Sequence, residues 1–481
     1  MRDMDFTKAA SPRLAVEVDW APSYELLMSL TKWTTRESEA TYDEGPQWFD
    51  KVRTKMSPEL LAALGRLGRV AKPWGGLIRP LRQEPVARQV PDLIDRIAAI
   101  EAAMTAGQAL DGAPPTVGFV FASRDHLDSA EQILEGLREA TSVERMVGCV
   151  GEAVIGGRRE VEGGPAVSVF LCQLPRPVET FHMTFLPTES GGVFAGWRFD
   201  AESSDAANPV HIMICDPFTF PADTLLAHLN QALPGVSVIG GMASGAQRPG
   251  ESVLFLDGAV HREGAVGVRL EGPMEIRTLV SQGCRPVGNS FVVTRAEENV
   301  VFELAGRPPL HRLRETVSAL SAPDRELVSQ GLHVGRVIDE YKSEFGQGDF
   351  LIRGVLGADP ESGAIAVGDR MEVGETVQFH VRDAASADEE LRALLEREVR
   401  SLPRPPAGAL LFTCNGRGSR MFSTPDHDAA LVSSLLGDVP LAGFFCAGEL
   451  GPVGGKNFLH GFTASIAVFV EDDGRPEAAR S

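Results

Sequence analysis

Two glycine-rich segments near the C-terminal end carry the residues best suited to bind a small charged molecule. In the first, NGRG (residues 415–418), two glycines flank Arg417 directly after an apolar stretch. In the second, CAGELGPVGGKN (446–457), Glu449 stands among glycines. A guanidinium can bind a carboxylate through two parallel hydrogen bonds, and a carboxylate can accept hydrogen bonds from an amino group. Together the two side chains would suit an α-amino acid.

The position of both segments favours this hypothesis, because ligand sites of α/β proteins gather where strands end. Glycine also lets the backbone approach a ligand closely. Arg353 interrupts an apolar strand pattern and could point into the same cleft. The candidate ligand-binding residues are Asn415, Gly416, Arg417, Gly418, Cys446, Gly448, Glu449, His460 and Arg353. The alternatives are a β-turn with a solvated arginine for NGRG, and a structural carboxylate that caps backbone N–H groups for Glu449.

A second reading of the same region is catalytic. Cys414 or Cys446 with His460 could supply a thiol nucleophile and its base. Both cysteines lie in apolar strand patterns, however, where cysteine usually acts as a small hydrophobe. We therefore expect no catalytic residues and keep a small-metabolite enzyme as the alternative. Asp426 and Asp428 precede a helical pattern, which predicts helix capping for both.

Several other site types are excluded by motif. GPVGGKN is not a phosphate-binding P-loop, because Leu450 and Asn457 replace the required glycine and Ser/Thr. The dispersed histidines form no HxH or HExxH pattern, so we expect neither a metal nor a cofactor. No GxSxG or GxGxxG sequence occurs.

Composition narrows the class of protein. A length of 481 residues suggests two to four domains. The net charge of −20 argues against a nucleic-acid partner, which would require a basic face. The N-terminal residues lack the apolar core of a secretory signal, and no apolar run reaches the ~20 residues of a membrane span. Six scattered cysteines suggest a reducing compartment. We expect a cytoplasmic protein that does not bind membranes.

From about residue 94 the chain alternates strand and helix patterns, and one arrangement occurs three times. An apolar strand leads into an amphipathic helix and then into a strand that ends in a glycine turn. The three repeats begin at TVGFVFAS (116–123), HIMICDPF (211–218) and ALLFTCNGRG (409–418). Small residues recur at two offsets, at Gly148, Gly240 and Gly443 and then at Ala153, Gly245 and Gly448. A β-branched run is expected to close each repeat, at 166–174, 252–258 and 463–470. This pattern predicts equivalent strands with a tight passage where a side chain would clash.

An antiparallel block separates the second and third repeats. Alternating patterns at 350–358, 364–368 and 375–383 are followed by a helical pattern over 386–402. Hairpins among helices predict mixed sheets rather than a Rossmann sheet. The predicted fold class is therefore α/β (mixed α+β), with pseudo-repeated strand–helix–strand units that form mixed sheets.

The first hundred residues differ from the rest, since they hold four of the five tryptophans but only five of the 50 glycines. Helical patterns at 24–30 and 58–70 are followed by a proline-rich stretch. We predict a small helical module with its linker over 1–93, removable without unfolding the rest, and a disordered tail over 473–481.

The segments LLFTCNGRGSRMF (410–422) and 438–469 resemble the C-terminal half of the FIST domain family. VGFVFASRDH (117–126), VGCVGEAVIGG (147–157) and VIGGMASGAQ (238–247) resemble its N-terminal half, with Ala153 where glycine is expected. The resemblance implies a FIST N-like domain over 94–305 and a FIST C-like domain over 306–472. It also implies a role in intracellular sensing, with amino acids as suspected ligands.

The expected function is thus that of an intracellular sensory or signal-transduction protein that binds a small molecule, an amino acid or a related metabolite. A signalling protein is a further expected partner. An interaction scaffold without a ligand is the third alternative. If Arg417 and Glu449 line one pocket, Arg417→Ala should abolish ligand binding and barely change the melting temperature.

Overall fold

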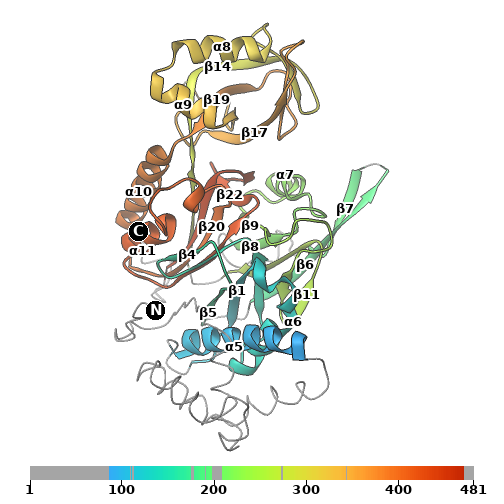
Figure 1. Cartoon of the computed structure of the whole chain (residues 1–481), viewed down its shortest axis with the longest axis vertical. Helices are drawn as coiled ribbons and strands as arrows, with labels where there is room; N and C mark the ends of the chain where they lie inside the picture. The colour runs from blue at the N-terminus through green and yellow to red at the C-terminus, as the bar shows by residue number, and fades with distance from the viewer. Residues whose placement is uncertain are drawn as a thin grey trace, which may run out of the picture.

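The computed structural model describes residues 86–470 apart from 109, 111–112, 175–177, 190, 198–208, 272–274 and 343. Within this range the chain forms a body of three mixed sheets and a separate closed barrel (Figure 1). The predicted fold class is confirmed. The module predicted over 1–93 lies almost wholly outside the described residues, as does the predicted tail. Of the predicted N-terminal module, only the last residues fall in a described element, the helix α5 (Val86–Gln108).

The predicted repeat occurs three times in the body, and its first two strands are parallel each time. A closing strand then runs antiparallel to the first. The first repeat contains β1 (Val117–Ser123), α6 (Ala130–Ala140), β2 (Met146–Gly151) and β5 (Val167–Cys172). The second contains β8 (Val210–Cys215), α7 (Ala222–Ala232), β9 (Ser237–Met242) and β12 (Ala265–Leu270). The third contains β20 (Pro406–Cys414), α11 (His427–Leu436), β21 (Leu441–Cys446) and β24 (Thr463–Val470). The prediction of three equivalent starting strands is confirmed.

One closing strand was assigned to the wrong segment. The run 252–258 forms β10 (Leu254–Leu256), which pairs with β2 of the first repeat. The closing strand of the second repeat is β12 instead. Both runs are apolar and β-branched, so their composition does not reveal which strand each one joins.

The three recurring glycines occupy one position in the repeat. Their parallel partners are Val120 for Gly148, Met213 for Gly240 and Leu411 for Gly443. A Cβ on any of these glycines would lie closer than 3.0 Å to the carbonyl oxygen of its partner. The prediction that a side chain would clash at this passage is therefore confirmed.

Replacing Gly443 with alanine should destabilise the folded chain by about 1–3 kcal/mol, because the paired strands must separate to admit the methyl group. Gly354→Ala is the matched control, since Gly354 also lies in a strand but has open space beside it. That change should stay within about 0.5 kcal/mol. Thermal unfolding followed by circular dichroism measures both, and equal melting temperatures would contradict the clash.

Each repeat also sends a hairpin into a neighbouring sheet. The hairpin of the first repeat joins β21, that of the second joins β2, and that of the third joins β9. These hairpins are β3 (Val154–Gly156) with β4 (Arg159–Val161), β10 with β11 (Ala259–His261), and β22 (Glu449–Val453) with β23 (Lys456–His460). The exchange is cyclic, so the three sheets interlock and each contains strands of two repeats.

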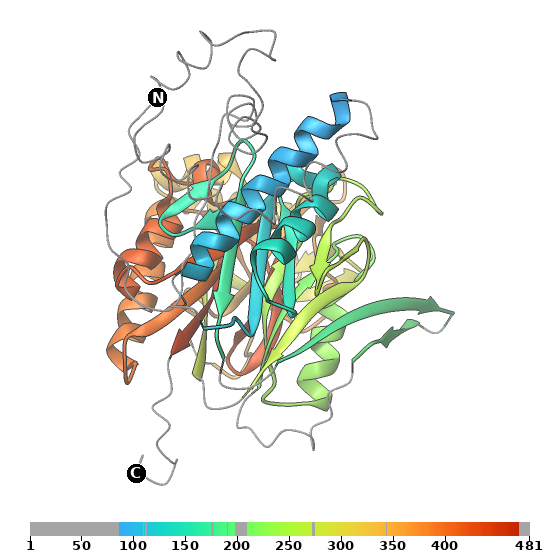
Figure 2. The same cartoon turned by 90° about the horizontal axis from the view of Figure 1, so that it is seen from below.

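The inner faces of the three sheets meet in one apolar core. Phe121 of the first repeat lies 5.3 Å from Phe444 and 6.3 Å from Phe412 of the third, between ring centroids. Helices cover the outer faces: α5 and α6 cover the first sheet, α7 the second, and α10 (Ala384–Ser401) and α11 the third (Figure 2). The central strands are buried on both faces, which explains their continuous apolar sequences.

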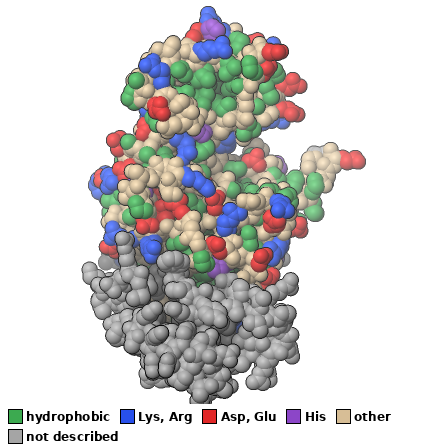
Figure 3. Space-filling model, in the orientation of Figure 1, with side chains coloured by type: hydrophobic (Ala, Val, Ile, Leu, Met, Phe, Trp, Pro, Cys, Tyr) green, Lys and Arg blue, Asp and Glu red, His purple; other side chains and the backbone are tan. Residues whose placement is uncertain are grey.

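Two further segments extend the sheets. The strands β6 (Glu179–Thr188) and β7 (Gly191–Ala195) continue the second sheet and form an arm that stands out from the body (Figure 3). β13 (Glu275–Gln282) lies along β24 at the edge of the third sheet. On the face shown in Figure 3, acidic and basic side chains are interspersed.

The barrel is inserted between β13 and α10. Its strands, in order around the barrel, are β14 (Cys284–Glu297), β15 (Val300–Leu304), β18 (Ile365–Val367), β17 (Phe350–Ala358), β16 (Leu332–Val337) and β19 (Thr376–Arg382). The helices α8 (Pro309–Ala319) and α9 (Ala322–Gln330) lie between β15 and β16 in sequence. The strands predicted at 350–383 and the helix predicted at 386–402 are confirmed. The predicted boundary between the FIST N-like and FIST C-like domains, between residues 305 and 306, falls inside this barrel.

The chain enters and leaves the barrel at one place. Cys284 at the start of β14 pairs with Arg382 at the end of β19, and the N–H of Asp383 donates to the carbonyl oxygen of Gly283. The two crossings are therefore neighbours. In the part of the chain that the structure covers, no helix has both the length and the apolar character needed to cross a membrane.

Candidate functional site

The candidate residues lie where the barrel meets the third sheet. We call this region the junction and define it by the loop Cys414–Gly418, the crossing Gln282–Cys284, the start of β22 and the turn at Phe462. Phe462 has a positive φ of 64°, which is unfavourable for a bulky residue. Its ring lies against Gly416 and 4.3 Å from the imidazole of His333, between ring centroids. A strained residue thus holds barrel and body together.

Hydrogen bonds also cross the junction. The Arg382 guanidinium at the end of the barrel donates to the carbonyl oxygen of Gly416. The Gln282 side chain donates from Nε2 to the carbonyl oxygen of Phe350 at 2.6 Å. The loop 414–418 is tied to β21, since the N–H of Asn415 donates to the carbonyl oxygen of Cys446 at 2.9 Å. Movement of the barrel would therefore disturb this loop.

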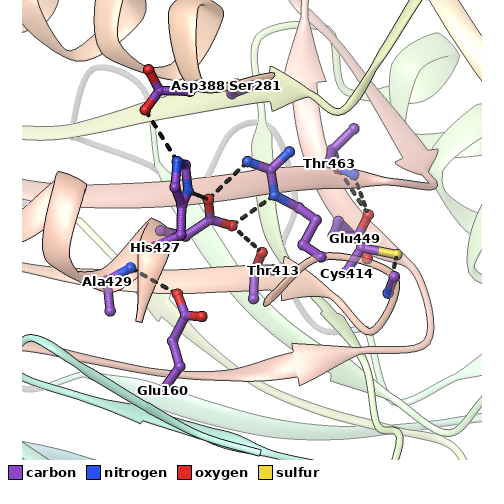
Figure 4. A network of polar contacts seen from close by, with 12 residues as sticks. Glu160, Ser281, Asp388, Thr413, Cys414, His427, Ala429, Glu449 and Thr463 are labelled. Carbon is purple, nitrogen blue, oxygen red and sulfur yellow. Dashed lines mark hydrogen bonds and ion pairs between the residues drawn. The ribbon is translucent and has the colours of Figure 1, made fainter. Parts of the chain in front are cut away.

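Arg417 is fully buried and paired with a carboxylate (Figure 4). Its Nε donates to Asp428 Oδ2 at 2.6 Å and its Nη2 to Oδ1 at 2.8 Å. Thr413 donates to the same carboxylate at 2.8 Å, and the His427 ring contacts it at 3.0 Å. Burial alone would raise the pKa of Asp428, but the guanidinium outweighs it and holds that pKa well below its usual range.

This pair changes two expectations. The two guanidinium nitrogens expected to grip a ligand carboxylate bind Asp428, so only Nη1 is left without a partner. Because Arg417 pairs with Asp428, we expect Arg417→Ala to lower the melting temperature as well, since it would leave a buried carboxylate unpaired.

The capping prediction for Asp426 and Asp428 is also wrong. Asp426 stands before α11 with a positive φ of 60°, and its carboxylate accepts from the N–H of Glu160 rather than from the helix. Asp428 binds Arg417 as described. The N–H of Ala429 is instead capped by Glu160 from β4, at 2.9 Å. The prediction considered only residues that adjoin the helix in sequence, whereas the residue that caps it comes from the first repeat.

Glu449 is fully buried on the other side of the loop (Figure 4). Its Oε2 accepts from the N–H of Thr463 at 3.0 Å and from its hydroxyl at 2.8 Å. Burial raises the pKa of Glu449 to about 8, against the opposing effect of the Thr463 hydrogen bonds. At neutral pH the group is therefore mostly protonated.

The second repeat offers an internal comparison. The repeat glycine pairs with Met213 in the second repeat and with Leu411 in the third. Three residues after these partners stand Asp216 and Cys414, which therefore occupy equivalent positions. Asp216 is fully buried, and both of its oxygens are used, by Ser252 and by Thr219. In the third repeat the carboxyl group comes from the hairpin, as Glu449, and its Oε1 has no hydrogen-bond partner among the described residues. Of these two repeats, only the third has a buried carboxyl oxygen that could still accept a hydrogen bond from a ligand or water.

Several buried polar atoms of the junction, with Glu449 Oε1 among them, lack a hydrogen-bond partner in the described part of the chain. In the body these are Glu449 Oε1, Gln282 Oε1, Asn415 Oδ1, Ser465 Oγ and Arg417 Nη1, and on the barrel side His333 Nδ1, His380 Nε2 and Arg382 Nε. Leaving one such atom unsatisfied costs about 1–3 kcal/mol. Buried polar atoms are nearly always bonded to protein, water or ligand. The polar atoms of this region are therefore candidates for contact with water or a ligand.

The glycines of the two segments serve protein packing. A Cβ on Gly416 would meet the Phe462 ring at 3.2 Å, one on Gly418 would meet Glu162 at 2.7 Å, and one on Gly448 would meet Leu459 at 3.0 Å. We expected these positions to leave room for a ligand. The structure fills the space beside each of them with a side chain of the protein.

The thiols and His460 lack the features of a nucleophile and its base. Burial raises the pKa of Cys414 to about 12 and that of Cys446 well above its usual value. Burial lowers the pKa of His460 to about 4, and its Nε2 contacts the carbonyl oxygen of Gly451 at 2.9 Å. No hydrogen bond joins His460 to either thiol among the described residues.

Arg353 reaches the junction from the barrel. Its Nε donates to Asp369 at 2.8 Å and its Nη1 to the carbonyl oxygen of Ile352 at 3.1 Å. Its charge contributes to the lowered pKa of His460, which pairs with Glu449 across β22 and β23. All nine candidate residues thus lie around the junction, although protein partners occupy most of their polar groups.

Sequence reasoning missed several polar residues of this region. Thr413, Gln282 and Asp428, the last expected only to cap a helix, are buried in or beside apolar stretches, where a buried polar residue is itself a signal. Glu390 of α10 accepts from Ser281 Oγ at 2.9 Å and from the N–H of Gln282, and burial raises its pKa to about 7. Within the described part of the chain, no group of three His, Cys, Asp or Glu side chains gathers where a metal could be held.

Comparison with known proteins shows the family. The FIST N domain matches residues 116–307 and the FIST C domain residues 309–452. The uncharacterized protein Rv0628c of Mycobacterium tuberculosis is 51% identical over 381 residues, covering 79% of this chain and 97% of its own. The uncharacterized protein Mb0898c of Mycobacterium bovis is 49% identical over 377 residues, covering 78% and 96%. The predicted resemblance is confirmed, and the chain belongs to the FIST family.

Proposed function

We propose that this chain is a sensory protein that binds a small polar ligand, an amino acid or a related metabolite, at the junction between barrel and body. The FIST family is associated with sensory signal transduction. The observation that carries the proposal is the group of buried, unpartnered polar atoms contributed by both parts of the chain. A ligand at this place would contact body and barrel together.

A sensory role requires that binding changes something distant. The barrel is joined to the body by two neighbouring crossings, so small changes at Gly283 and Asp383 would reorient the whole barrel. The Arg382 guanidinium connects this neck to the loop that carries Arg417. The proposed output is a change in barrel orientation, read by a protein partner.

We propose further that the chain does not convert its ligand. Both thiols of the junction are held in their neutral form by burial, and a thiol nucleophile acts as the thiolate. The neutral His460 has its Nε2 in contact with a backbone carbonyl and not with a thiol. These features support a binding site over the alternative enzyme.

Retention of a metabolite tests the proposal. The purified chain is incubated with a small-molecule extract of cells and re-isolated, and the released molecules are identified by mass spectrometry. Wild type should retain one metabolite in near-stoichiometric amount. The Glu449→Gln chain should retain at least tenfold less of this metabolite, because an amide cannot ionise and has an NH₂ group in place of one carboxyl oxygen.

Glu389→Gln is the control. It makes the same substitution at an exposed glutamate of α10, so retention should equal that of wild type. A wild-type chain that retains nothing would favour the scaffold alternative. An extract in which a metabolite is consumed would favour the enzyme.

A further inference from the structure

The arm formed by β6 and β7 exposes a pair of apolar side chains. β6 pairs with β12 over residues 179–183 and with β7 over residues 184–188. Outside the body the arm is therefore a ribbon of two strands (Figure 3). Leu186 and Val193 lie directly opposite each other across it and are 55% and 54% exposed. A ribbon of two strands is at best marginally stable in water, so a partner that adds strands would stabilise this arm.

The two faces of the arm have different surroundings. Phe185 and Phe194 form a cross-strand pair on the face towards α7, where the Phe194 ring lies 6.2 Å from that of His228 between ring centroids. Leu186 and Val193 lie on the opposite face, because side chains alternate along a strand. The protein therefore covers one face of the arm and leaves the apolar pair on the other face in solvent.

The edge of β7 is suited to pairing with another strand. β7 is the last strand of its sheet, so one of its edges has no neighbouring strand among the described residues. Natural proteins protect such edges with charged residues or proline. β6 contains Pro187, which cannot donate to a strand added beside it, whereas β7, GGVFA (191–195), contains neither proline nor a charged residue. Strand addition is therefore favoured at β7.

Charge favours a second copy of the chain as the partner of this edge. The net charge of −20 makes two copies repel each other on average. The paired stretches 184–188 and 191–195 contain no charged residue, so two arms can approach without that repulsion. The same stretches give a charged partner protein no group of opposite sign to bind, whereas a second arm presents a matching apolar pair.

We propose that β7 pairs antiparallel with β7 of a second copy about a two-fold axis at Val193, which makes a symmetric dimer. In such a contact Val193 lies opposite the partner's Val193, and Gly192 lies opposite the partner's Phe194. The apolar pairs of the two arms then form one row across four strands. An axis at Gly192 or at Phe194 would instead place Val193 opposite a glycine or an alanine, and the row would be interrupted.

Sedimentation velocity of the full chain over a range of concentrations tests this proposal. The arm supplies fewer residues than the ~20–30 a side of a standard interface, so we expect a reversible dimer with a dissociation constant on the order of 10–100 µM. Val193→Asp should raise that constant about a hundredfold or more, because the axis places two carboxylates opposite each other. Val373→Asp, at a 65% exposed valine between β18 and β19, is the matched control and should associate as wild type does.

Two variants of opposite charge locate the axis. Val193→Lys and Val193→Asp chains should each remain monomeric alone, whereas their equimolar mixture should form a heterodimer at least as tight as the wild-type dimer. Both variants should melt with wild type at concentrations where all are monomeric, because Val193 is half-exposed. The proposal is overturned if wild type remains monomeric, which would leave β7 to a different partner. It is also overturned if the Val193→Asp chain associates as wild type does, or if the mixture remains monomeric.

Discussion

Asp428→Asn is expected to destabilise the folded chain by about 3–5 kcal/mol, the largest effect of any single substitution considered. Arg417 and Asp428 are both fully buried, and Arg417 donates two of its hydrogen bonds to this carboxylate. The amide would leave the guanidinium buried without a counter-charge. Urea unfolding followed by circular dichroism measures the loss.

A matched substitution at an exposed pair provides the control. Asp438 also pairs with an arginine, Arg158, at 2.8 Å, but both side chains are more than half exposed. Asp438→Asn should therefore cost less than about 1 kcal/mol. The double variant Arg417→Met with Asp428→Leu should recover most of the loss, since apolar side chains can replace a buried pair. An Asp428→Asn chain as stable as the Asp438→Asn chain would contradict this account.

The second large effect is a loss of stability as pH rises from 7 to 8. At lower pH the buried histidines act in the opposite direction, because burial lowers their pKa values and the unfolded chain alone binds their protons up to about pH 6.5 (His211, His333, His380 and His460). Burial raises the folded-state pKa of Glu449 to about 8 and that of Glu160 to about 8, while both groups titrate near 4.5 when unfolded. Between these values each of these two groups binds more protons in the folded chain than in the unfolded chain. Each group's contribution is thus complete below pH 4.5 and is lost as pH rises through 8, at about 1.4 kcal/mol per pH unit.

Asp428 does not offset this loss in the same window. Its folded-state pKa is lowered, so its contribution is present above the unfolded value near 3.8 and is lost only at lower pH. Glu449→Gln should accordingly reduce the fall in melting temperature between pH 7 and pH 8 by about a third to a half, because Glu160 and Glu390 contribute the rest. Glu389→Gln, at an exposed position of the same chain, should fall as steeply as wild type. Equal slopes for all three proteins would show that Glu449 ionises in the folded state as it does in water.

The repeats could be predicted from sequence because their signals are local. Each first strand is an apolar run followed by a helical pattern, and each repeat glycine is followed five residues later by a second small residue. The strand β14 was missed for a local reason too. Its sequence contains Pro286 and Gly288, and the pairing with β19 shifts register between Val287 and Ser290. Such an irregular strand has no alternating pattern to recognise.

The exchange of hairpins could not be predicted, because strand partners depend on contacts distant in sequence. The same limit applies to the site. Arg417 lies in a loop at a strand end as predicted, whereas Glu449 is the first residue of β22. Their partners Asp428 and Thr463 were not predicted. Asp428 follows Arg417 by eleven residues, and only the fold of β20 onto α11 brings the two together.

The central claim is that a small ligand occupies the junction, and an experimental density map of the chain isolated with its retained metabolite tests it most directly. We predict continuous density for a small molecule within hydrogen-bonding distance of Glu449 Oε1, bounded by the Gln282 side chain and the Cys414–Gly418 loop. Density for isolated waters alone at these atoms, with the metabolite bound elsewhere, would contradict the account.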